Sequence, residues 1–358
     1  MANNAFTILP QPDAAIYQSQ AMAISLGQQP AYFVAGKVGW PILLSWLYDT
    51  GGIHIEIGLI LNALLAAALV PILFATAENL RAGSGRYAIW LLIIMPGWWL
   101  WSSTLIREPL IWLLTAVGGL MLVRLKDQRW GAIFPLAVDC IGLAWVRAPL
   151  SVLLVSGAAV AILLAKGRLA PRVTTTVVLA GSILLIAGNQ LSRVSSLDPS
   201  TFGATRDFLA QAGSQFDSSN RVFTYFRVLS GPWPWELLHL GILAIPDVLY
   251  LWLFGAILVV GRRNLRRDYL WLGAPALVIC AGISVIASNY GLVIRLRAMA
   301  MLLAIPVVAA TIDSLRPDRF EGLNPKYGSA VRVAARRSPR VGSTATTAPS
   351  YPITQHPQ

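Results

Sequence analysis

Long apolar runs separated by short polar loops dominate the chain from residue 55 to residue 312. Several of these runs reach the roughly 20 residues that a helix needs to cross the hydrocarbon core of a bilayer. The pattern predicts membrane-spanning helices at about 55–77, 87–104, 109–123, 131–146, 149–165, 173–190, 237–260, 269–288 and 293–312. We therefore expect an all-α fold, a polytopic transmembrane helical bundle of about nine to ten spans with one larger outer loop.

Polar stretches divide the chain further. Residues 1–30 contain no Lys or Arg and lack the basic and apolar regions of a signal peptide. Residues 31–48 are apolar but interrupted by glycine, lysine and proline, which suits an interfacial or re-entrant element. We expect an outer N-terminal segment (1–54), a first transmembrane block (55–190), an outer loop (191–236), a second transmembrane block (237–312) and a disordered cytoplasmic tail (313–358).

Charge sets the orientation. The net charge is +12, although only 12% of the residues are charged, and the positive residues gather in short loops and the tail. Such loops stay on the cytoplasmic side, so nucleic-acid binding is not needed to explain the charge. We predict a multi-pass protein of the cell (inner) membrane, with its N-terminal segment outside and its C-terminal tail in the cytoplasm. An outside N-terminus further requires that residues 31–48 cross the membrane or that one more helix precedes the chain.

The stretch from Met95 to Leu113 collects unusual side chains between two apolar runs: Trp98, Trp99, Trp101, Ser102, Ser103, Thr104, Arg107 and Glu108. Tryptophan rings favour the headgroup level of a membrane. Pro109 suits the first turn of a helix, and Glu108 before it is favoured by the positive end of the helix dipole. The stretch predicts a tight turn between two membrane helices. Its charges are either ordinary interfacial residues or the lining of a polar cavity.

Other ionisable groups fall on the same predicted outer side. Asp13, Glu56 and Glu108 could act as general bases, or could hold a divalent cation that bridges to a phosphate. A metal site from Asp13, His54 and Glu56 would lack a known ligand spacing. Guanidinium groups match phosphate oxygens in two-point geometry, so four arginines are candidate phosphate ligands: Arg107, Arg147, Arg295 and Arg297.

Aromatic and amide groups complete the candidate substrate site: Tyr17, Trp233, Trp235 and Asn289. The prolines around Trp233 and Trp235 favour a stiff, extended segment. This segment would lay both rings on the membrane surface or over a sugar ring. Cys140 and Cys280 fall inside apolar runs, where we interpret them as small core residues.

Short motifs recur in a characteristic order: Asp13 and Tyr17, Gly27, Gly39-Trp-Pro, Leu47-Tyr48, Asn62, Pro96, Trp101-Ser-Ser, Arg107-Glu108-Pro109, Leu143-Ala-Trp-Val-Arg147, Gly231-Pro-Trp-Pro-Trp, Asn289-Tyr-Gly, Arg295-Leu-Arg297 and Pro306. This order resembles the GT-C superfamily of polytopic glycosyltransferases. It resembles more closely the glycosyltransferases and polymerases of bacterial exopolysaccharide clusters. The resemblance implies sugar transfer from a polyprenyl-phosphate donor at the outer leaflet, with the early acid Asp13 as base or metal partner.

Three functions are compatible with these features. The first is a membrane enzyme that transfers or polymerises sugars linked to a polyprenyl (di)phosphate, in contact with the lipid bilayer and with other polysaccharide-assembly proteins. The second is a transporter or flippase for such a lipid, which would need polar groups at mid-membrane and matched halves. The third is a non-catalytic assembly factor of the same pathway. The predicted spans have mostly apolar centres, which favours the enzyme over the transporter.

Overall fold

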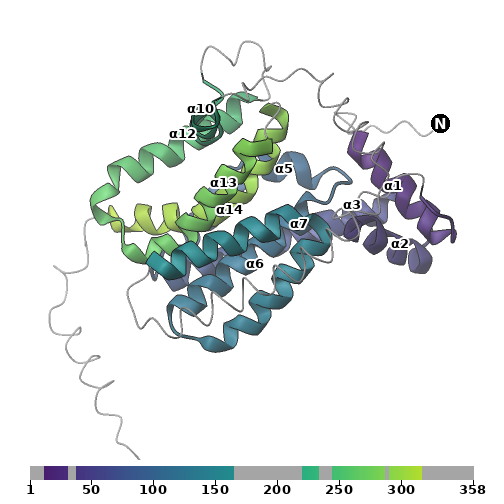
Figure 1. Cartoon of the computed structure of the whole chain (residues 1–358), viewed down its shortest axis with the longest axis horizontal. Coiled ribbons are helices and arrows are strands. Elements are labelled where there is room, and N and C mark those ends of the chain that lie inside the picture. Colours follow the sequence, from purple (N-terminus) through teal and green to yellow (C-terminus); the bar gives the residue numbers. More distant parts are fainter. Residues whose placement is uncertain (1–11, 31–37, 165–219, 234–243, 287–289, 317–358) are drawn as a thin grey trace, which may run out of the picture. The chain divides into compact units, whose positions relative to one another are not determined.

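The computed structural model describes residues 12–30, 38–164, 220–233, 244–286 and 290–316 (Figure 1). Within these ranges the regular elements are all helices. In chain order they are α1 (Pro12–Ser25), α2 (Gly39–Gly51), α3 (Ile55–Leu80), α4 (Gly85–Ile93), α5 (Pro96–Ser102), α6 (Glu108–Lys126), η1 (Trp130–Ala132), α7 (Ile133–Leu164), α10 (Arg221–Ser230), α12 (Ala244–Val260), η2 (Arg262–Asn264), η3 (Arg267–Tyr269), α13 (Leu270–Ile286) and α14 (Tyr290–Ser314).

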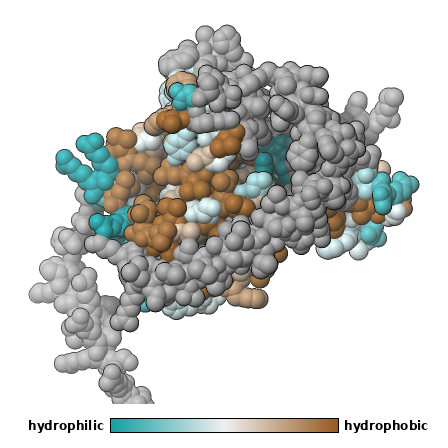
Figure 2. Space-filling model, viewed as in Figure 1, coloured by the Kyte–Doolittle hydropathy of each residue, from teal (hydrophilic) through white to brown (hydrophobic). Residues whose placement is uncertain are grey.

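Five helical segments of the described ranges are long and apolar enough to cross a membrane: Ile55–Leu80, Glu108–Lys126, Trp130–Leu164, Arg267–Val285 and Val293–Ser314. Ile245–Val260 is a shorter apolar helix. Large hydrophobic side chains remain exposed on these helices, and Figure 2 shows them gathered over one face of the described part. Apolar surface of this extent is stable against lipid rather than water. The prediction of an all-α, multi-pass membrane protein is therefore confirmed.

The chain reverses direction inside α7. The Ser151 hydroxyl donates to the carbonyl oxygen of Cys140 at 2.8 Å, although the two residues are 11 positions apart in the chain. In a straight helix those residues would lie about 16 Å apart. Arg147 has the non-helical angles φ −158° and ψ 80°, and Pro149 follows it in the helix. α7 is thus a helical hairpin with its apex at Arg147, in agreement with two separate predicted helices at 131–146 and 149–165.

The predicted single span at 87–104 is wrong. The structure has two short helices there, α4 and α5, which separate at Met95. Met95 adopts an extended conformation (φ −72°, ψ 112°) because the ring of Pro96 disfavours a helical residue before it. Residues 103–107 then form the turn that leads into α6. Glu108 and Pro109 lie in the first turn of α6, as the sequence predicted.

The N-terminal segment is more regular than expected, because it folds into α1 and α2. These helices contact each other around a small apolar cluster that includes Tyr17, Trp40 and Leu44. α2 begins against the α7 hairpin, where a Cβ atom at Gly39 would lie only 2.8 Å from the Trp145 ring. Glycine at this position therefore allows the N-terminal segment to approach the hairpin apex.

α14 passes through the centre of the main core, which it forms with α3, α6, α7 and α13. Arg295 lies near the start of α14 and Asp313 near its end. Their separation of 18 positions corresponds to about 27 Å along a helix, close to the thickness of a bilayer core. The two groups therefore lie at opposite ends of the bundle.

Several predictions fall outside the described residues. They concern the span at 173–190, most of the outer loop at 191–236, and the tail beyond residue 316.

Candidate functional site: an arginine–carboxylate cluster

Seven side chains from five separate parts of the chain meet at the end of the bundle where α14 begins. They are Asp13 and Tyr17 of α1, Trp101 of α5, Arg107 and Glu108 at the start of α6, Arg147 at the hairpin apex and Arg295 of α14. We name this group the arginine–carboxylate cluster. Of the sequence-predicted site residues, six are brought together here: Asp13, Tyr17, Arg107, Glu108, Arg147 and Arg295.

Arg295 is the central cation of the cluster. Its Nε donates to Glu108 Oε1 at 2.5 Å, and its Nη1 donates to Asp13 Oδ2 at 2.5 Å. Its guanidinium carbon lies 5.9 Å from the centre of the Trp101 ring, within the range of a cation–π contact. Arg295 thereby connects the N-terminal segment to both α5 and α6.

The two carboxylates have different environments. The Glu108 side chain is 0% exposed, and its Oε1 atom lies 3.6 Å from Arg147 Nη1 as well as close to Arg295. The Asp13 side chain is 44% exposed. A carboxylate enclosed between two cations is fixed in place, whereas a half-exposed one can reach a substrate. Asp13 is therefore the accessible acid of the pair.

Arg107 stabilises the hairpin apex. Its Nη1 donates to the carbonyl oxygen of Val146 at 3.0 Å, where the first half of α7 ends. Its guanidinium also lies over the Tyr17 ring, 5.8 Å from the ring centre. Burial raises the pKa of the Tyr17 phenol above its ordinary value, against the opposing effect of the Arg107 charge. Tyr17 therefore stays neutral at physiological pH and contributes its ring face.

Asn62 of α3 holds the turn that presents Arg107 and Glu108. Its side-chain amide donates to the carbonyl oxygens of Thr104 at 2.5 Å and Ile106 at 2.9 Å. Asn62 is fully buried, so both bonds lie in an environment where an unpaired carbonyl would be costly.

The cluster is suited to binding an anion. Three arginines face two carboxylates, which leaves one net positive charge. Two buried guanidinium nitrogens, Arg107 Nε and Arg147 Nη1, have no hydrogen-bond partner among the described residues. Buried donors of this kind normally have hydrogen-bond partners. A ligand with several acceptor oxygens would supply the missing hydrogen bonds.

An apolar pocket opens beside the cluster. It has a volume of about 30 Å³ and lies between the second half of α7, α13 and α14. Arg147 is its only charged lining residue, and the others include Leu150, Ile279, Leu296 and Met299. The pocket therefore combines apolar walls with one cationic member of the cluster, Arg147.

Arg297 is not part of the cluster. Its Nη1 donates to the carbonyl oxygens of Val228 at 3.1 Å and Gly231 at 2.5 Å, and its Nη2 forms an ion pair with Asp247. Because α14 begins at Tyr290, Arg295 and Arg297 lie two residues apart inside a regular helix and point to different sides. Arg297 is 1% exposed and joins α14 to α10 and α12.

The other predicted residues lie elsewhere. Glu56 is exposed in the first turn of α3, with no ion pair in the described ranges. Trp233 is half-buried; its ring lies 5.5 Å from that of Phe223, and its Nε1 donates to the Ser230 hydroxyl. Trp235 and Asn289 fall outside the described residues. Among those described, no three His, Cys, Asp or Glu side chains are placed to hold a metal ion.

The role of Asp247 was not predicted from the sequence. The only signal available was an acid in the first turn of a strongly apolar helix, which implies a buried partner. Trp101 and Asn62 appeared only as members of short motifs, and their contacts with Arg295 and with the turn before α6 depend on tertiary packing.

Known proteins share the fold of this chain without close sequence similarity. No family model matches the chain, and neither does any curated protein. Two crystal structures of ArnT from Cupriavidus metallidurans do match. The one bound to undecaprenyl phosphate has a TM-score of 0.60 and 14% identity, and the apo one has a TM-score of 0.57 and 15% identity. In both, the match covers 91% of this chain and 59% of the ArnT chain, so this chain spans less than two thirds of ArnT.

The protein is therefore a polytopic membrane protein with an ArnT-like fold. The polytopic helical fold expected from the order of its motifs is confirmed.

Proposed function

We propose that this protein is a membrane glycosyltransferase of cell-surface polysaccharide biosynthesis. It transfers or polymerises sugars from a polyprenyl-(di)phosphate carrier at the outer face of the membrane. The observation that carries the proposal is that Arg147 and Arg295 both lie against Glu108, while Arg295 also holds the accessible carboxylate of Asp13.

Arg147 and Arg295 bind the phosphate of the carrier. Both lie against Glu108, which orients them, and Arg147 has an unsatisfied nitrogen for a phosphate oxygen. Guanidinium groups bind phosphate in two-point geometry and keep their charge at any physiological pH. A diphosphate brings further acceptors within reach of the same net positive cluster.

Asp13 acts as the general base. It takes the proton from an acceptor hydroxyl while that oxygen forms a bond to the anomeric carbon of the donor sugar. The bond between the anomeric carbon and the phosphate oxygen breaks, and the bonding electrons leave with the polyprenyl phosphate. The charge that develops on this leaving group is stabilised by the arginines.

The carrier lipid lies with its phosphate at Arg147 and its first isoprene units along the apolar pocket of Leu150, Ile279 and Met299. One of the two ArnT structures of similar fold is bound to undecaprenyl phosphate, which supports a polyprenyl-phosphate ligand. The outer location is supported by the basic loops, which belong to the opposite end of the bundle.

Binding of farnesyl phosphate to the purified protein tests the proposal, with farnesol as the uncharged control. Wild-type protein binds the phosphate and not the alcohol. Arg147→Gln and Arg295→Gln each weaken binding by about tenfold or more, the loss expected for one charge-assisted hydrogen bond. Arg86→Gln, which replaces an exposed arginine in the first turn of α4, serves as the matched control and keeps full affinity. Equal binding of farnesol, or full affinity in both variants, would overturn the phosphate assignment.

A further inference from the structure

We propose that residues 261–269, the turn between α12 and α13, form a binding site for anionic phospholipids in the leaflet at the end of the bundle opposite the cluster. We name this segment the arginine turn. It consists of the 3-10 turns η2 and η3 and the residues that join them.

The arginine turn concentrates unpaired positive charge. Arg262, Arg263, Arg266 and Arg267 are all exposed. None of the four guanidinium groups has a hydrogen-bond or ion-pair partner within the described ranges of the chain. Asp268 is the single acid of the arginine turn. The turn therefore carries a strong local excess of positive charge. Arginines near an anionic bilayer surface each contribute attraction that falls off within a Debye length.

The arginines lie at the edge of the lipid-facing surface. Val259 and Val260 at the end of α12 are 63% and 67% exposed, and Gly261 follows them directly. Figure 2 shows hydrophobic residues covering this face, with hydrophilic residues at its margin. Side chains that follow immediately after a lipid-facing segment lie at headgroup depth, where their guanidinium groups meet phosphates.

An exposed leucine separates the two arginine pairs. Leu265 is 44% exposed and lies between Arg263 and Arg266 in the chain. An apolar side chain with cationic neighbours matches an amphiphilic surface, since it enters the acyl boundary while the arginines contact headgroups. An acidic protein could form ion pairs with the arginines, but it would leave Leu265 and Val260 without an apolar partner. We therefore assign the surface to lipid.

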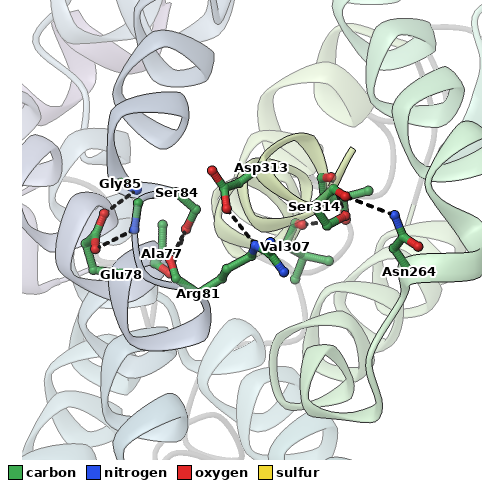
Figure 3. Close-up of polar contacts among 11 residues, drawn as sticks. Ala77, Glu78, Arg81, Ser84, Gly85, Asn264, Val307, Asp313 and Ser314 are labelled. Atoms are coloured by element: carbon green, nitrogen blue, oxygen red, sulfur yellow. Dashed lines mark hydrogen bonds and ion pairs between the residues drawn. The ribbon is translucent and has the colours of Figure 1, made fainter. Parts of the chain in front are cut away.

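The backbone of the turn is also held against the end of α14, which reduces the entropy lost on binding. Gly261 packs so closely on α14 that a Cβ atom there would clash with the Thr311 side chain. Asn264 Nδ2 donates to the carbonyl oxygen of Ser314 at 3.2 Å. Figure 3 shows this bond beside the ion pair between Arg81 and Asp313, which joins the end of α14 to the turn after α3. The arginines are thus presented from a fixed support.

Lipid binding to the purified full chain tests the inference. Phosphatidylglycerol is titrated against the protein and its retention is followed by native mass spectrometry, with phosphatidylcholine as the neutral lipid. The variant R262Q/R263Q removes two charges from the arginine turn. The matched control R86Q/R129Q removes two exposed charges elsewhere on the same predicted side, one in the first turn of α4 and one just before η1. Farnesyl phosphate binding at the opposite end reports whether each variant is folded.

R262Q/R263Q weakens retention of phosphatidylglycerol by about tenfold or more, as expected from two arginines near an anionic surface. R86Q/R129Q retains it nearly as well as the wild type. Leu265→Ser, which keeps every charge, gives an intermediate loss. Equal losses in both double variants would show unspecific attraction and overturn the site. So would preferential binding of a polyglutamate peptide over the lipid, which would assign the turn to an acidic protein.

Discussion

Arg295 donates from Nη1 to Oδ2 of Asp13 at 2.5 Å, although the two residues lie 282 positions apart in the chain. In the proposed mechanism, a phosphate bound to Arg295 would compete with this carboxylate for the same donors. The proposal therefore gives the two side chains separable roles, Arg295 in holding the ligand and Asp13 in the chemical step.

Asp13→Asn separates binding from turnover. The substitution preserves size and removes the base, so farnesyl phosphate affinity stays within a few fold of the wild type. Release of polyprenyl phosphate from a lipid-linked sugar falls by about a hundredfold or more. Arg295→Lys keeps the charge but loses the two-point fork, so binding weakens by about 1–3 kcal/mol. Normal turnover in Asp13→Asn would exclude Asp13 as the base and leave Glu56 and Glu108 as candidates.

Arg297→Gln reduces stability more than Arg295→Gln does. It leaves Asp247 buried without its cation, and removing one partner of a buried pair costs about 3–5 kcal/mol. The measurement is thermal unfolding in detergent. The double variant R297M/D247L removes both charges and recovers most of the loss. If Arg297→Gln unfolds like the wild type but loses farnesyl phosphate binding, Arg297 contacts the ligand, as its place among the candidate phosphate ligands of the sequence would imply.

A cysteine pair tests the α7 hairpin. In a Cys280→Ala background, Ser151→Cys lies beside Cys140, and mild oxidation links the two within one chain. Mass spectrometry of digested protein detects the linkage. Ser156→Cys, an exposed position further along the second half, remains unlinked to Cys140. A straight helix would hold residues 140 and 151 about 16 Å apart, so the absence of linkage at residue 151 would argue against the hairpin.

Labelling of intact cells tests the orientation. Ser103 and Ala82 are both exposed, near opposite ends of α3. In a cysteine-free background, Ser103→Cys reacts with a membrane-impermeant maleimide from outside, and Ala82→Cys reacts only after lysis. The reversed pattern would place the arginine–carboxylate cluster on the cytoplasmic side.

The Tyr17 ring supports Arg107 through its face rather than through its hydroxyl. Because burial raises the pKa of this phenol, it carries no charge at neutral pH, and Tyr17→Phe leaves farnesyl phosphate affinity unchanged. Tyr17→Leu removes the cation–π contact, which is worth about 0.5–2 kcal/mol, and lowers both affinity and thermal stability. Equal behaviour of the two variants would show that the contact between Tyr17 and Arg107 contributes nothing.

Local patterns predicted much of the fold. Apolar run length is enough to recognise a membrane helix, and Pro109 after Glu108 was enough to place the start of α6. The kink at Met95 was missed because the apolar run continues through Pro96, although proline restricts the residue before it. α1 was missed, and α2 was expected only as part of an interfacial or re-entrant element at 31–48. The stability of both helices comes from packing around Trp40 and Leu44 rather than from a strong sequence period.

The sequence by itself determined the class of the protein and most of the side chains of the candidate site. Charges in a lipid-facing chain are costly, so Asp13, Arg107, Glu108, Arg147 and Arg295 stood out without any structure. Only the tertiary structure decided which charged side chains pair with each other. Arg295 forms ion pairs with Asp13 and Glu108, whereas Arg297 forms one with Asp247. Ion pairs depend on distances of a few ångströms between segments hundreds of residues apart, and such distances are set by packing of the whole bundle.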